Sequence, residues 1–290
     1  MRPVWRGDVP HAFGVALPFV WLQNGLLRLV MGYQFLNTSR EGAIEHVRLN
    51  RPDLRNALND VVLDELRRWS ESLRSDASVR VAVLAGAGRH FCAGADIDWM
   101  RRMGAASESD NMADAQRLSS TFHALDTLPV PLIGRVHGAA IGGGMGLAAI
   151  CDMVVAADDT QFGFSEVRLG IVPAAISPFV LAKIGGSAAR ELFLTGSRFS
   201  AARALQLGLV HRVVPAAELD EVVAAWAAEL MAGAPSAIAL AKRLIRTVSG
   251  RQYEDVASFT SRAIAEQRMS SEGREGLLAF LEKRPPAWNH

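Results

Sequence analysis

Cysteine is scarce in this sequence, since Cys92 and Cys151 are the only two among 290 residues. Neither has a second cysteine or a histidine at the spacing that zinc sites use, and two thiols give little basis for a disulfide framework. A disulfide-stapled scaffold and a metal centre are therefore both disfavoured. We expect two buried, reduced thiols, no metal and a cytoplasmic location.

The sequence also lacks an excess of charge of either sign. Its 31 Lys and Arg residues and 30 Asp and Glu residues give a net charge of +1. Because no basic field would attract a polyanion, we expect no nucleic-acid partner. No internal repeat or low-complexity tract is present. Half of the residues are hydrophobic and 21% are charged, a balance that is ordinary for an α/β protein with one large domain.

Long hydrophobic runs are absent as well. The apolar run at residues 12–22 is too short to cross a membrane and contains Pro18, so we expect no membrane helix. A signal peptide is disfavoured because Asp8 lies in its leading region and no small-residue cleavage site follows the run. We interpret residues 1–36 as a non-catalytic N-terminal extension, of which an upstream start codon is one possible origin.

Apolar segments of strand length alternate with segments of helical periodicity in the first half of the chain. Strands are predicted at residues 43–49, 81–85, 131–136 and 153–157, with helices after the Asn59-Asp60 cap and at 115–128. This alternation is typical of an α/β fold with a mostly parallel sheet. Beyond Gly170 helices are predicted at 187–194, 200–207 and from 218 and 236 onward, with an extended piece at 210–214.

Two glycine-rich turns have the character of binding loops. Gly94 permits a sharp turn that directs the N–H group of Ala95 outward, although a plain surface loop would have the same composition. The run Gly142-Gly143-Gly144 leads from a strand into a helix, whose first N–H groups are free and lie at the positive end of its dipole. No Gly-Lys-Ser/Thr follows this run, and Phe91 stands where a dinucleotide fingerprint needs glycine, so both nucleotide motifs are disfavoured.

Glu166 is the third feature. It lies between aromatic, aliphatic and glycine residues, and burial there would raise the pKa of its carboxyl group toward neutrality. Such a group suits general acid/base work, whereas the structural alternative is an ion pair with Arg168. Two amides on one carbonyl oxygen and a carboxylate beside the adjacent carbon would together stabilise an enolate.

The order and spacing of these segments resemble the enoyl-CoA hydratase/isomerase family, also called crotonases. The likeness runs from about Glu41 to the C-terminus and includes Leu49-Asn50-Arg51-Pro52 and Asn56-Ala57-Leu58. It implies a spiral of ββα units over residues 37–230 and a C-terminal helical region, residues 231–290, that forms homotrimers or homohexamers. It also implies an acyl-CoA substrate and no cofactor other than the coenzyme A (CoA) of that substrate.

The resemblance assigns roles to individual positions. Ala95 and Gly143 match the two amides of the oxyanion hole, and Glu166 matches the carboxylate that handles the proton at the α-carbon. The predicted CoA-binding residues are Arg55, Ala93, Asp96, Ile97 and Gly142. His90 and His137 match no catalytic position, so we interpret them as structural or surface residues.

One departure concerns a second glutamate that many hydratases of the family carry. The matching position here is Gly146. Hydration by Glu166 and water alone, another acid reaching in, and a different reaction all remain open. The motif wording resembles the bacterial methylglutaconyl-CoA hydratase branch, whose acid substrate would need a cation such as Arg101, Arg102 or Arg168. The alternatives are an isomerase, a decarboxylase, a thioester hydrolase or a degenerate CoA-binding subunit.

Overall fold

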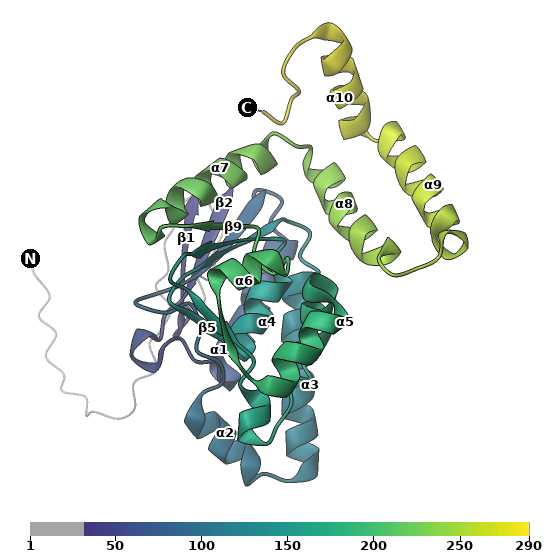
Figure 1. Cartoon of the computed structure of the whole chain (residues 1–290). Helices are drawn as coiled ribbons and strands as arrows, with labels where there is room; N and C mark the ends of the chain where they lie inside the picture. Colours follow the sequence, from purple (N-terminus) through teal and green to yellow (C-terminus); the bar gives the residue numbers. More distant parts are fainter. Residues whose placement is uncertain (1–31, 290) are drawn as a thin grey trace, which may run out of the picture. The chain divides into compact units, whose positions relative to one another are not determined.

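The computed structural model describes residues 32–289 (Figure 1). The chain divides into two compact units, Met1–Gln34 and Phe35–His290, and all elements below belong to the second. The predicted extension includes Phe35 and Leu36, but both belong to this second unit. The Phe35 carbonyl accepts a hydrogen bond from the Asn50 amide, and Leu36 lies opposite Leu49. Residues 1–31 of the predicted extension lie outside the described residues.

A six-stranded sheet forms the centre of the fold, in the order β1-β2-β3-β4-β6-β9. Its strands are β1 (Leu36–Glu41), β2 (Ile44–Leu49), β3 (Val81–Gly86), β4 (Leu132–Val136), β6 (Met153–Ala157) and β9 (Arg212–Val214). Within this six-stranded sheet only the β1–β2 pair is antiparallel, and the other neighbouring strands are parallel. A second sheet holds β5 (Ala139–Ile141), β7 (Gln161–Gly163) and β8 (Arg198–Ser200). The α/β class and the mostly parallel sheet are confirmed.

Helices cover the large sheet because each has one apolar face. Helix α1 (Asp60–Arg74) begins where the Asn59 side chain accepts a hydrogen bond from the Val62 amide, as predicted, and it buries Leu66 and Trp69. Helix α7 (Leu219–Met231) lies along the sheet (Figure 1). Its Val223 and Trp226 side chains pack in the core with residues of β3, β4 and β6. The remaining helices of the domain are α2 (Ile97–Gly104), α3 (Glu108–Asp126), α4 (Gly143–Ile150), α5 (Ser177–Thr195) and α6 (Ala201–Gln206).

Three helices end the chain: α8 (Pro235–Val248), α9 (Tyr253–Met269) and α10 (Ser271–Glu282). Lys242 anchors α8, because its buried ammonium group donates to the Val130 carbonyl at 2.8 Å and pairs with Asp152. Among residues 32–289 no single helix is both long and apolar enough to cross a membrane. The segments Ala216–Met231 and Pro235–Val248 meet that description only as a pair, bent by 105°.

Some predicted bounds were wrong. Helix α3 begins seven residues before the predicted 115–128, because its buried residues, Thr121, Phe122 and Leu125, lie only in its last turns. Helix α5 begins at Ser177 instead of 187, and Gly185 interrupts it with a φ of 70°. The predicted state of the two cysteines is confirmed: both are free and buried, and burial raises each thiol's pKa to about 12.

Candidate active site

The loop after β3 is held by a buried asparagine. Asn56 is 1% exposed, and its side chain donates to the carbonyls of Ala87 and His90 at 2.8 and 2.7 Å. Its side-chain oxygen accepts a hydrogen bond from the Arg51 amide at 2.9 Å. One side chain thus joins the turn after β2 to both ends of the turn after β3. Satisfied buried amides of this kind fix backbone positions.

The Ala95 amide projects from this loop without a protein partner. Leu58 donates to the Gly94 carbonyl and accepts from the Asp96 amide, both at 2.8 Å. These two bonds form a parallel bridge in which Ala95 lies opposite Leu58. In a parallel bridge the N–H group of the residue between the two bonded positions, here Ala95, points away from the partner strand. Gly94 has a φ of 101°, which disfavours any other residue there. Within residues 32–289 no oxygen accepts a hydrogen bond from the Ala95 amide.

The second amide comes from the start of α4. Gly142 adopts a φ of 52° and a ψ of −115°, and its N–H group donates to the Gly163 carbonyl at 2.9 Å. The helix begins at the next residue, so the Gly143 amide is the first of its free N–H groups. No acceptor for it lies in the described part of the chain. The helix dipole adds positive potential at the same place.

Glu166 begins a short 3-10 helix, η2 (Glu166–Leu169). A side-chain carbon on Gly142 would lie 3.2 Å from its Oε1 atom, so the carboxylate lies against the turn that opens α4. Its Oε2 atom is buried without a hydrogen-bond partner among residues 32–289. Burial raises the pKa of this carboxyl group above its ordinary value, and its own backbone N–H group opposes this. Arg168, the predicted structural partner, donates to the Thr195 carbonyl instead.

The three residues predicted to be catalytic line one cavity of about 120 Å³. Ala95, Gly143 and Glu166 contribute its polar groups. The other lining residues are apolar: Leu58, Trp99, Leu118, Phe122 and residues 171–176. Within the part of the chain that the structure describes, Glu166 is the only titratable residue of this lining. Two free amides and one poorly solvated carboxylate in an apolar cavity can polarise a carbonyl oxygen and move a proton at the neighbouring carbon.

The predicted CoA-binding residues lie around this cavity's loops rather than in its lining. Ile97 is 70% exposed, Arg55 is exposed with a φ of 53°, and the Ala93 amide donates to the Arg55 carbonyl. The Asp96 carboxylate caps α2 and pairs with Arg51 at 2.8 Å, so its side chain has a structural role. Together with Gly142, these assignments stay predictions.

The Arg51–Asp96 pair yields a test of how the Ala95 amide is held. Both side chains are nearly buried, and Arg51 also donates to the Ala57 carbonyl at 2.7 Å. We expect Arg51→Met to lower the free energy of unfolding by about 3 kcal/mol, because it leaves Asp96 without its cation. Chemical denaturation with matched activity assays measures this. The exposed pair of Arg101 and Asp98 provides a control, since Arg101→Met should cost less than about 1 kcal/mol.

Gly146 has no room for an acid. A side-chain carbon there would overlap with Ile176 and lie 2.8 Å from the Phe122 ring. These two side chains occupy the volume that a second glutamate would need. The lining contains no other acid, so the hypothesis of a second acid reaching in finds no candidate among the described lining residues.

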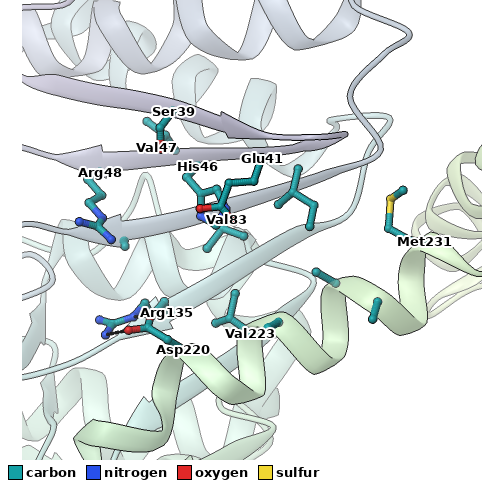
Figure 2. Close-up of a pocket in the computed structure, with 15 residues that line it drawn as sticks. Ser39, Glu41, His46, Val47, Arg48, Val83, Arg135, Asp220, Val223 and Met231 are labelled. Carbon is teal, nitrogen blue, oxygen red and sulfur yellow. Dashed lines mark hydrogen bonds and ion pairs between the residues drawn. The ribbon is translucent and has the colours of Figure 1, made fainter.

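A larger cavity, of about 360 Å³, lies between the six-stranded sheet and α7 (Figure 2). It contains none of the predicted site residues. Arg135 and Asp220 form a bidentate ion pair across it, and Ala224, Ala227 and Ala228 of α7 leave space above the sheet. No group of three residues able to hold a metal ion occurs among residues 32–289.

Comparisons with known proteins identify the family. The enoyl-CoA hydratase/isomerase family model matches residues 39–290. A short-chain-enoyl-CoA hydratase of Clostridium acetobutylicum is 32% identical over 251 residues, which cover 84% of this chain and 94% of the relative. The 2,3-dehydroadipyl-CoA hydratase of Escherichia coli is 34% identical over 258 residues, covering 87% and 97%.

A solved structure has the same fold. The crystal structure of an enoyl-CoA hydratase from Shewanella pealeana superposes with a TM-score of 0.85 and 35% identity, and the match covers 88% of this chain and 96% of that one. The chain therefore belongs to the enoyl-CoA hydratase/isomerase family, and the resemblance predicted from its motifs is confirmed.

Sequence reasoning could not place the cavity walls. Trp99 comes from α2, Leu118 and Phe122 come from α3, and Ile176 precedes α5, so only the fold brings them together. An apolar residue in a helix gives no signal that distinguishes a ligand-facing wall from core.

Proposed function

We propose that this enzyme adds water across the double bond of a 2-enoyl-CoA thioester. The amides of Ala95 and Gly143 bind the thioester oxygen and stabilise the enolate charge, each contributing on the order of 3 kcal/mol. Glu166 orients the water, takes its proton and delivers a proton to the α-carbon, a contribution of about 10²- to 10⁴-fold. The observation that carries the proposal is one apolar cavity lined by these three residues.

The test uses crotonyl-CoA, whose conjugated thioester loses its ultraviolet absorbance when water adds. We expect turnover by the purified full chain, with 3-hydroxybutyryl-CoA as the product identified by mass. Absence of hydration across a panel of about a dozen 2-enoyl-CoA esters, with CoA binding intact, would favour a degenerate binding subunit instead.

A second candidate is an isomerase that moves a double bond from the 3- to the 2-position of an enoyl-CoA. The packing of Ile176 and Phe122 around Gly146 favours it, because a single carboxylate can remove a proton at the α-carbon and return it at the γ-carbon without a second acid. With a 3-enoyl-CoA substrate the conjugated absorbance would rise. The sign of the absorbance change therefore separates the two reactions.

The finer assignments remain part of this proposal. The motif wording favours a methylglutaconyl-type acid, whereas the described residues of the cavity lining include no arginine and argue against an acyl carboxylate. A homotrimer or homohexamer is supported by exposed apolar side chains of α10, with Phe280 at 80% and Leu281 at 76% exposure. Light scattering on the purified chain measures that mass. The cytoplasmic location stays a prediction.

A further inference from the structure

The lining of the catalytic cavity also limits which acyl group it can hold. We propose that it admits a short, uncharged acyl group, and that Trp99, held in place by Asp114, sets the length limit. This inference rests on the proposed function, since it concerns the acyl part of the same substrate. Its three supports are the cavity's size, the hydrogen bond of the indole and the absence of a cation from the lining.

The cavity is small. Its volume is about 120 Å³, and an apolar cavity of roughly 150 Å³ holds one benzene molecule. A chain of about four to six carbons fills such a space, whereas an eight-carbon chain exceeds it. A longer chain has to displace a wall residue or extend through the open side of the cavity.

Trp99 is the largest side chain of the wall. It lies on α2, three residues after the Asp96 cap, and is 5% exposed. Its indole Nε1–H donates to Asp114 Oδ1 of α3 at 3.2 Å. Arg117 approaches the same carboxylate at 3.7 Å. Because the hydrogen bond joins two helices, rotation of the indole out of the cavity would leave both its N–H group and the carboxylate with poorer partners.

The described lining residues disfavour a charged acyl group because they include no cation. Among the described lining residues the only charged group is Glu166, which would repel an acyl carboxylate. The arginines predicted to bind such a group lie outside this lining. Arg101 pairs with Asp98, Arg102 pairs with Asp60, and Arg168 donates to the Thr195 carbonyl. A carboxylate in this cavity would lose its hydration without gaining a cation, which is unfavourable.

The first experiment compares 2-octenoyl-CoA with crotonyl-CoA as kcat/KM ratios. We expect Trp99→Ala to raise the octenoyl-to-crotonyl ratio by about 30-fold or more, and Trp99→Phe by less. Asp114→Ala should raise it and Asp114→Asn should not, because the amide oxygen still accepts the indole hydrogen bond. Trp226→Ala is the matched control. Trp226 is buried to a similar degree, but it lies on α7 and packs against the six-stranded sheet, so the ratio should not change.

The second experiment measures binding to the cavity without turnover. Calorimetric affinities of butyryl-CoA and octanoyl-CoA, which cannot react, should show the same change in preference in the Trp99 variants. If the wild type hydrates no enoyl-CoA yet these affinities change as expected, the proposed function fails and the length limit stands. If the variants leave both ratios within about twofold of the wild type, the length limit is wrong.

The third experiment tests charge with two esters that differ by one carboxylate, 3-methylcrotonyl-CoA and 3-methylglutaconyl-CoA. We expect the neutral ester to be preferred by about 100-fold or more in kcat/KM. Equal use of the two, or a preference for the acid, would overturn the exclusion of charge and would restore the methylglutaconyl assignment.

Discussion

Glu166→Gln should lower kcat for crotonyl-CoA by about 10²- to 10⁴-fold while leaving butyryl-CoA affinity within about threefold of the wild type. The amide cannot accept a proton from water, yet it matches the carboxylate in size. The proposed oxyanion donors, the amides of Ala95 and Gly143, are main-chain groups and are unaffected by this change. Steady-state kinetics and calorimetry measure the two effects separately, and near-normal turnover by the variant would remove Glu166 from the mechanism.

The same variant has a second expected result, which follows from the raised pKa of the Glu166 carboxyl group. A carboxyl group with a raised pKa in the folded state stabilises the protein fully below its ordinary pKa, and that stability is lost as pH rises through the folded value. Glutamine does not ionise, so it escapes this loss. We therefore expect the melting temperature of Glu166→Gln relative to the wild type to increase from pH 4.5 to pH 8.

The activity of the wild type should have the opposite pH dependence. As a base, Glu166 must be ionised, so kcat/KM should fall as pH decreases through its raised pKa. The acid limb of the profile should consequently lie above the ordinary glutamate value of 4.5. A limb at or below 4.5 would show that the carboxylate is well solvated in the free enzyme.

Gly146→Glu should not create a two-carboxylate hydratase; it should disrupt the site. Its first side-chain carbon would overlap with Ile176 and press on Phe122, both of which are buried. Even Gly146→Ala should cost about 1 to 3 kcal/mol by overpacking, which corresponds to a fall in melting temperature of roughly 2 to 12 °C. The glutamate variant would add the cost of a buried charge and should lose most of its activity.

Two further variants make this test specific. Gly186→Ala is a matched control, because nothing lies within 4 Å of the added carbon in α5, and it should be neutral or stabilise by up to about 1 kcal/mol. Ile176→Ala in the Gly146→Ala background should recover part of the lost stability by making room. A Gly146→Glu protein with unchanged melting temperature and higher hydratase activity would contradict the packing argument.

The strands with long apolar runs could be predicted from sequence because burial on both faces leaves a continuous signal. The strand at 153–157 has the predicted bounds, and the predicted strand at 131–136 begins one residue later. The three-residue strands β5, β7 and β8 could not be predicted, since three residues are too few to show a period. Helix α2 was not predicted either. It has eight residues and buries only Trp99, so its sequence shows no repeat of apolar positions.

The candidate site divides in the same way. The two glycine turns and Glu166 could be recognised because backbone geometry restricts the residue types at 94 and 142. The partners of these turns could not be recognised. Nothing in the sequence indicates that Asn56 joins two distant turns, or that Phe122 and Ile176 fill the space beside Gly146. Such contacts depend on how helices pack.

The hydrogen bond from the Gly142 amide to the Gly163 carbonyl has an evolutionary consequence. It joins Gly142, the residue before the Gly143 amide, to the end of β7, three residues before Glu166. Under the proposed mechanism, reactivity depends on main-chain anchoring that most substitutions leave intact, whereas selectivity depends on exchangeable side chains such as Trp99. A lineage with this arrangement can diversify its substrates gradually, one wall residue at a time, without rebuilding its chemistry.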